Sequence, residues 1–280
     1  MPANLAELRY EVALANRVLA HEGVLDAFGH VSARHPVDPD RYLLSRSRSP
    51  ELIEPADVLE YTVDSQPVVP SRQQLYAERV IHGEIYRARP DVMAVCHHHA
   101  PSLMPFCVSG EPFTPVFHLG AACGATVPFW DQRDDFGDTN LLVVKAEEGA
   151  SLARALGHHS MVLMRNHGAT VVGEHLRQLV FRAIYTCHNA DYQRAAKGLG
   201  TERPLTPGEI EKASALSSMP NVTSRTFEYW TMRLAKAGEL PPSWQPAKKA
   251  ASPKPASARA KAKKKTSSAA LRRAGGGRKR

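Results

Sequence analysis

The sequence contains few cysteines, and their spacing excludes a disulfide scaffold. Only four of the 280 residues are cysteines, and no two of them show a C-x-x-C spacing. All four lie in apolar or helical stretches. We therefore expect reduced thiols in a cytoplasmic protein.

The chain also lacks a long apolar run. No segment approaches the roughly 18–20 apolar residues that a membrane-spanning helix needs. The first residues do not show the basic segment followed by an apolar one that marks a signal peptide. Hydrophobic residues still make up 43% of the sequence, which suffices for a sizeable core. We expect a protein with no membrane contact.

Acidic residues are absent from residues 245–280, which contain 13 Lys and Arg. The chain has 36 basic and 28 acidic residues, so 23 basic residues face 28 acidic ones in 1–244, a net charge of about −5. We predict one large domain or two small ones in 1–244 and a disordered basic tail in 245–280. No aromatic residue follows Trp244 to stack on bases, so we expect no specific nucleic-acid binding and only non-specific contact with polyanions.

Apolar periodicity predicts helices and short strands without a regular alternation of the two. Apolar residues recur at helical spacing in 5–22 and 73–89, and the runs 92–96 and 161–164 are typical of buried strands. We further predict strands at 41–44, 59–63, 141–145 and 169–173, and helices at 151–156, 175–199, 207–218 and 224–237. This mixture favours an α/β fold with a central, mainly antiparallel sheet flanked by helices.

Histidines are numerous, and some of the 13 are clustered. His97 and His99 follow a predicted strand and share one of its faces, which is a common way to offer two imidazoles to one metal. An exposed polar strand end is an equally good interpretation of this pair alone. His167 ends another apolar strand and can supply a third imidazole. Glu78 and His82 lie one helical turn apart before the first pair, where a carboxylate can act as a fourth ligand or as an acid and base.

These motifs together resemble the class II aldolase/adducin family. The resemblance rests on the segment from Glu78 to His99, on Gly29-His30-Val31-Ser32 and on Asn166-His167-Gly168, and it spans residues 5–230. It implies a single domain with a nine-stranded, mainly antiparallel sheet and an assembly into tetramers. It also implies one divalent metal per subunit, with ligands His97, His99 and His167 and with Glu78 as the catalytic carboxylate.

The sequence departs from the sugar-phosphate aldolases of that family at their phosphate site. His30 replaces an Asn, Tyr76 and Ala77 replace two serines, and Arg46-Ser47-Arg48 stand in place of a Thr-Gly pair. Guanidinium groups suit carboxylates, and His30 and Tyr76 can flank an aromatic ring. A surface loop is the alternative interpretation for the two arginines. A sugar phosphate is therefore not the expected substrate.

The departures resemble a decarboxylase branch of the family that includes hydroxy-methylpyridine-dicarboxylate and dihydroxyphthalate decarboxylases. This resemblance implies a lyase that removes carbon dioxide from an aromatic carboxylate with an ortho hydroxyl group. Further substrate-binding candidates are Ser32, His118 in an apolar context and Tyr229 on a C-terminal helix. A core imidazole is an equally good interpretation of His118, and an apolar core position is the favoured alternative for Tyr229.

Three other functions stay open. One is an aldolase that acts on a non-phosphorylated substrate, and another is a relative that uses iron and oxygen. The third is an adducin-like binding protein, against which the three histidines and Glu78 argue. The residues do not select among Zn, Mn, Fe and Co.

Overall fold

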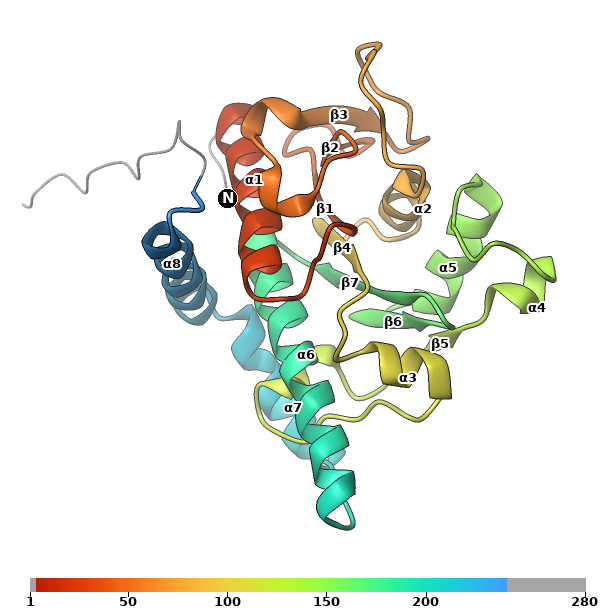
Figure 1. The fold of residues 1–280 in the computed structure, drawn as a ribbon, viewed down its shortest axis with the longest axis vertical. Coiled ribbons are helices and arrows are strands. Elements are labelled where there is room, and N and C mark those ends of the chain that lie inside the picture. Colours follow the sequence, from red (N-terminus) through yellow and green to blue (C-terminus); the bar gives the residue numbers. More distant parts are fainter. Residues whose placement is uncertain (1–3, 241–280) are drawn as a thin grey trace, which may run out of the picture. The chain divides into compact units, whose positions relative to one another are not determined.

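A seven-stranded sheet forms the centre of the computed structural model, which describes residues 4–240 (Figure 1). Its strands lie in the order β3-β2-β1-β4-β7-β6-β5. All neighbouring strands are antiparallel except β5 and β6. The strands are β1 (His30–Arg34), β2 (Arg41–Ser45), β3 (Val58–Thr62), β4 (Ala94–His98), β5 (Phe129–Trp130), β6 (Met161–Met164) and β7 (Gly168–Gly173). The predicted antiparallel sheet is confirmed, with seven strands in residues 4–240 rather than nine.

Every predicted helix is present, but several bounds differ, and α3 and α4 were not predicted. The α5 and α8 helices begin at Ala146 and Pro220 rather than at 151 and 224, and α7 ends at Ser214 rather than at 218. The largest difference is at α2, which is much shorter than predicted. It begins at Arg79 rather than at residue 73, because the preceding backbone has other partners: the Gln74 carbonyl accepts the Ser47 amide. The helices are α1 (Leu5–His21), α2 (Arg79–Ala88), α3 (Met104–Ser109), α4 (Gln132–Phe136), α5 (Ala146–Leu156), α6 (Leu176–Leu199), α7 (Pro207–Ser214) and α8 (Pro220–Ala237).

The predicted strand at 141–145 is wrong. Leu141 has a left-handed backbone with φ of 67°, which breaks an extended run. The Val143 amide donates to Glu78, and the Val144 and Lys145 amides donate to Glu148 in the first turn of α5. Carboxylates therefore take the backbone groups that a neighbouring strand would otherwise pair.

Helices cover both faces of the sheet (Figure 1). Val31 and Cys96 point to the face that α1 and α6 cover, where the larger apolar core lies. Leu44 and Val95 point to the opposite face, where α2 and α5 enclose a second core. Since side chains alternate along a strand, His30, Ser32 and His97 lie on this second face. The candidate site therefore lies between the sheet and the segment that leads into α2.

The described residues agree with the small number of cysteines and the lack of long apolar runs in the sequence. Within residues 4–240, no helix is both long and apolar enough to cross a membrane. All four cysteines are free and buried. The basic tail predicted in 245–280 lies outside the described residues.

Candidate metal site

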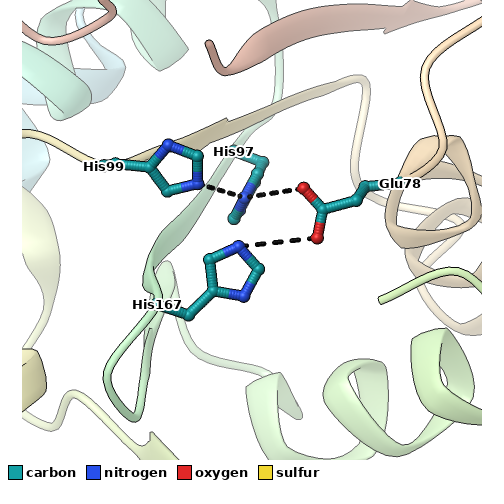
Figure 2. Close-up of side chains that lie close together, drawn as sticks. All are labelled: Glu78, His97, His99 and His167. Atoms are coloured by element: carbon teal, nitrogen blue, oxygen red, sulfur yellow. Dashed lines mark hydrogen bonds and ion pairs between the residues drawn. The ribbon is translucent and has the colours of Figure 1, made fainter. Parts of the chain in front are cut away.

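Four side chains from three separate segments converge on one point (Figure 2). One potential ligand atom from each of Glu78, His97, His99 and His167 lies within 4.8 Å of the others. The Nε2 atoms of His97 and His99 are 3.1 Å apart. The Glu78 carboxylate lies 3.6 Å from His97 Nε2 and 3.4 Å from His167 Nε2. These are the four residues that the sequence singled out, and the structure brings them together.

The β4 strand delivers two of the imidazoles. His97 is fully buried on the α2/α5 face, and its Nδ1 lies 3.2 Å from the Thr170 hydroxyl on β7. This contact turns Nε2 toward the cluster, an orienting arrangement common for metal-binding histidines. His99 stands just beyond the strand end and reaches the same point. His98 points into the opposite core, as the alternation predicts.

A tight turn between β6 and β7 delivers His167. Asn166 has a left-handed backbone with φ of 52°, a conformation that asparagine tolerates better than most residues. A Cβ on Gly168 would lie 2.4 Å from the His98 carbonyl oxygen and 2.8 Å from the His99 ring. Only glycine permits this approach, so each residue of Asn166-His167-Gly168 has a separate physical role.

Glu78 reaches the cluster from the N-cap position of α2. Its Oε1 accepts the Val143 amide at 3.0 Å. Burial raises the pKa of Glu78 to about 7, against the lowering effect of that amide. Because α2 begins after Glu78, the predicted helix face shared by Glu78 and His82 does not form, and His82 contacts other residues.

The imidazoles of the cluster are held in their neutral form. Burial, followed by the neighbouring His167, lowers the pKa of His97 well below the usual histidine value. Burial and His99 lower the pKa of His167 to about 4. A neutral imidazole has a free lone pair on one nitrogen. Three such rings beside one carboxylate form a donor set that fits a divalent metal of the zinc, manganese, iron or cobalt kind.

Beside the cluster lies a second group of buried polar side chains. His30 Nδ1 is 2.6 Å from His82 Nε2, and His82 Nδ1 is 2.6 Å from the Ser32 hydroxyl. That hydroxyl lies 2.7 Å from the phenol of Tyr86. Ser32 is fully buried among these partners, so the structure does not bring it to an open substrate position. His30 is near the cluster, with its ring centroid 5.3 Å from that of His97.

The arginine segment is connected to this region through Tyr76. The Tyr76 ring packs on His30 at 4.5 Å between centroids, and its hydroxyl donates to the Arg48 carbonyl. Both arginines are bound to one carboxylate: Arg46 Nε and Arg48 Nη1 each lie 2.6 Å from Asp57. Ser47 is half-buried, and its amide is bonded to Gln74. About a third of each guanidinium-bearing side chain stays exposed.

Two predicted substrate residues lie away from the cluster in this chain. His118 is exposed, and its ring lies 5.9 Å from that of Phe117 between centroids. Tyr229 on α8 is 59% exposed, so the favoured core position for it is wrong.

The residues that orient the ligands were not identified from the sequence. Thr170 is a polar residue within an otherwise apolar strand, and this contrast was an available signal. Val143 binds Glu78 through its backbone amide, a role that any residue type except proline can fill and that the sequence therefore does not indicate. The Tyr86 hydroxyl partner, Ser32, is known only once β1 packs on α2.

Comparison with known proteins agrees with these features. The chain is 39% identical over 247 residues to the decarboxylase tropJ of Talaromyces stipitatus, covering 79% of this chain and 91% of the relative. It is 30% identical over 201 residues to a 3,4-dihydroxyphthalate decarboxylase of Arthrobacter keyseri, covering 65% of this chain and 76% of the relative.

A solved structure has the same fold. The crystal structure of an aldolase II superfamily protein from Pseudomonas syringae aligns with a TM-score of 0.71 at 21% identity, covering 86% of this chain and 96% of the other. Residues 10–193 match the Class II Aldolase and Adducin N-terminal domain family, a span that contains the whole four-residue cluster. The chain therefore belongs to the class II aldolase and adducin family.

Proposed function

We propose that this protein is a metal-dependent lyase that decarboxylates an aromatic carboxylate with a hydroxyl group ortho to the leaving carboxylate. The observation that carries the proposal is the convergence of Glu78, His97, His99 and His167 within 4.8 Å. Similarity to proteins named decarboxylases supports the reaction, and the dihydroxyphthalate decarboxylase supports the substrate class.

We propose that His97, His99 and His167 hold one divalent metal, with Glu78 facing it. Their neutral rings offer lone pairs, and Thr170 orients His97. A bound divalent ion would supply Lewis-acid stabilisation of the negative charge that carbon–carbon cleavage leaves on an oxygen of the substrate.

Glu78 is the group proposed to move a proton. Decarboxylation leaves a carbanion equivalent on the ring carbon, which must gain one proton after carbon dioxide departs. Burial favours the neutral, protonated form of the Glu78 carboxyl, and this form can donate that proton. The Val143 amide holds the carboxylate in place.

The substrate is proposed to lie on the side of the cluster that His30 and Tyr76 border. Their packed rings offer an aromatic surface beside His97. Arg46 and Arg48 are proposed to receive a second carboxylate through guanidinium nitrogens that do not contact Asp57.

A homo-oligomer in the cytoplasm is proposed as the working state. Tyr229 and Met232 are 59% and 50% exposed on α8, which leaves apolar surface for a neighbouring subunit and lets Tyr229 reach that subunit's site. Sedimentation velocity is expected to give a tetramer, and a monomer at micromolar concentration would contradict this part of the proposal.

The test is carbon dioxide release without oxygen. The metal-loaded protein is incubated anaerobically with 3,4-dihydroxyphthalate and, as the matched control, with phthalate, which lacks the ortho hydroxyl. We expect carbon dioxide from the first compound only. Release that depends on oxygen, or an absence of release from all ortho-hydroxy aromatic dicarboxylates tested, would contradict the proposal.

A further inference from the structure

A continuous hydrogen-bonded chain runs through the second core to the edge of the metal cluster. It connects the Tyr86 phenol, the Ser32 hydroxyl, both ring nitrogens of His82 and Nδ1 of His30, with three contacts of 2.6–2.7 Å. All four side chains are buried. This series of hydrogen bonds crosses from α2 to β1. Because β1 pairs with β4, His30 lies opposite His97.

Tyr86, at one end of the hydrogen-bonded series, determines which group donates in each of its hydrogen bonds. The Ser32 hydroxyl is the one hydrogen-bond partner of the Tyr86 phenol among residues 4–240, at 2.7 Å. If Ser32 donated to the phenol oxygen, the phenolic hydrogen would have no acceptor in this part of the protein. Leaving a buried donor unpaired is unfavourable, so Tyr86 donates to Ser32.

The remaining protons follow from this first assignment. Ser32 has one hydroxyl hydrogen, and its remaining partner is His82 Nδ1, so Ser32 donates there. His82 is a neutral imidazole, since burial lowers its pKa to about 3, and its single hydrogen therefore lies on Nε2. It donates to His30 Nδ1. A neutral His30 then carries its own hydrogen on Nε2.

We propose that Tyr86, Ser32 and His82 are positioning residues that hold His30 as the Nε2–H tautomer and present this N–H as a hydrogen-bond donor beside the metal cluster. The His30 Nε2 atom has no hydrogen-bond partner among residues 4–240. Its ring packs against the rings of Tyr76 and His97, at 4.5 Å and 5.3 Å between centroids. The N–H therefore borders the space where a substrate meets the cluster.

The ligand for this donor is an anionic oxygen, either a carboxylate or a phenolate, of the aromatic substrate. This identification rests on the proposed decarboxylase function, whereas the tautomer does not. A fixed donor accepts no proton, so His30 is a binding group for the substrate anion and Glu78 remains the residue that moves the proton.

Histidine tautomers can be measured directly in the full-length chain. Protein labelled with ¹⁵N-histidine is studied by NMR at pH 7.5 without metal, and the His30 and His82 signals are assigned through their loss in His30→Gln and His82→Gln. We expect the Nε2–H tautomer for both rings. Ser32→Ala should give mixed tautomers at His30. A wild-type His30 in the Nδ1–H form would overturn the proposal.

A matched control separates the hydrogen-bonded chain from general packing. The Tyr42 ring packs on that of Tyr86, at 5.3 Å between centroids. Its hydroxyl, however, forms hydrogen bonds with the Ser65 hydroxyl and the Arg79 carbonyl. Tyr86→Phe and Tyr42→Phe each remove one buried hydroxyl. Only Tyr86→Phe is expected to disturb the His30 tautomer, and an equal disturbance by Tyr42→Phe would overturn the proposal.

Kinetics give a second readout. With 3,4-dihydroxyphthalate as probe, Ser32→Ala is expected to lower kcat/KM about 10- to 100-fold, mainly through KM, with metal content unchanged. A change below twofold would overturn the assignment of His30 as a donor to the substrate. If wild-type protein shows the expected tautomer but no decarboxylation, the proposed function fails and the positioning chain stands.

Discussion

Burial determines the protonation state of each residue in the four-residue cluster. The same burial raises the pKa of Glu78 to about 7 and lowers the pKa of His167 to about 4. Opposite shifts follow because a low dielectric disfavours the charged form of each group. At neutral pH the cluster therefore has little net charge without metal.

His98, whose side chain points to the face of the sheet opposite to that of His97, offers a measurable consequence of burial. Burial, followed by His99, lowers the pKa of His98 to about 3. The folded state then binds fewer protons than the unfolded state below about pH 6.5, so stability is present above that pH and is lost as pH falls. Between pH 7 and pH 5 this side chain is expected to remove ~2 kcal/mol from the free energy of unfolding.

The measurement is urea unfolding of metal-free protein at pH 7 and pH 5. His98→Gln should weaken the pH dependence by the amount stated above, because glutamine does not titrate. His158→Gln, which removes a histidine at an exposed site, serves as the control. Equal pH dependence in wild type and His98→Gln would refute the assignment.

Glu78→Gln tests the proton-moving role. Glutamine keeps the size and can still accept the Val143 amide but holds no transferable proton. We expect kcat to fall about 10²- to 10⁴-fold while three imidazoles still bind metal. Steady-state kinetics and metal analysis of the same sample check this, and a kcat within tenfold of wild type would rule the role out.

At the scale of elements, the turn from Asn166 to Gly168 decides whether the third imidazole reaches the site. A Cβ at Gly168 would lie 2.4 Å from the backbone oxygen of His98, and neither β4 nor β7 can move freely. Gly168→Ala is therefore expected to weaken metal affinity at least tenfold and to lower the melting temperature.

Gly208→Ala is the matched control for this change. Gly208 lies within α7, and a Cβ there would meet nothing within 4 Å. Alanine favours a helix over glycine by about 0.5–1 kcal/mol, so stability should rise slightly with metal affinity unchanged. Calorimetry measures the stability of both variants, and metal titration measures their metal affinity. Equal metal affinity in Gly168→Ala and wild type would contradict the proposed role of Gly168 in placing His167.

Elements with strong periodicity could be predicted from the sequence, and so could the members of the four-residue cluster. The strand Met161–Met164 was predicted with its observed bounds, and the His-x-His spacing identified two members of the cluster, His97 and His99. The start of α2 and the absence of a strand at 141–145 could not be predicted, because backbone groups there bond to Glu78, Glu148 and Ser47. The series of hydrogen bonds that orients His30 depends on the register of β1 against β4, and no local sequence pattern encodes this register.

At the scale of the whole molecule, the net charge of +8 does not describe the site. All four cluster residues lie between Glu78 and His167, within a body whose expected net charge is negative. Deleting 245–280 is therefore expected to change kcat/KM less than twofold while abolishing retention on heparin at low salt. A large loss of turnover would show that the basic segment takes part in catalysis.

The central claim is that one metal, held by three histidines, is required for decarboxylation. The most direct test compares wild type with His167→Ala for metal per subunit by mass spectrometry and for anaerobic carbon dioxide release from 3,4-dihydroxyphthalate. We expect about one metal per subunit and turnover in wild type, and neither in the variant. Full turnover by metal-free His167→Ala in chelated buffer would contradict it.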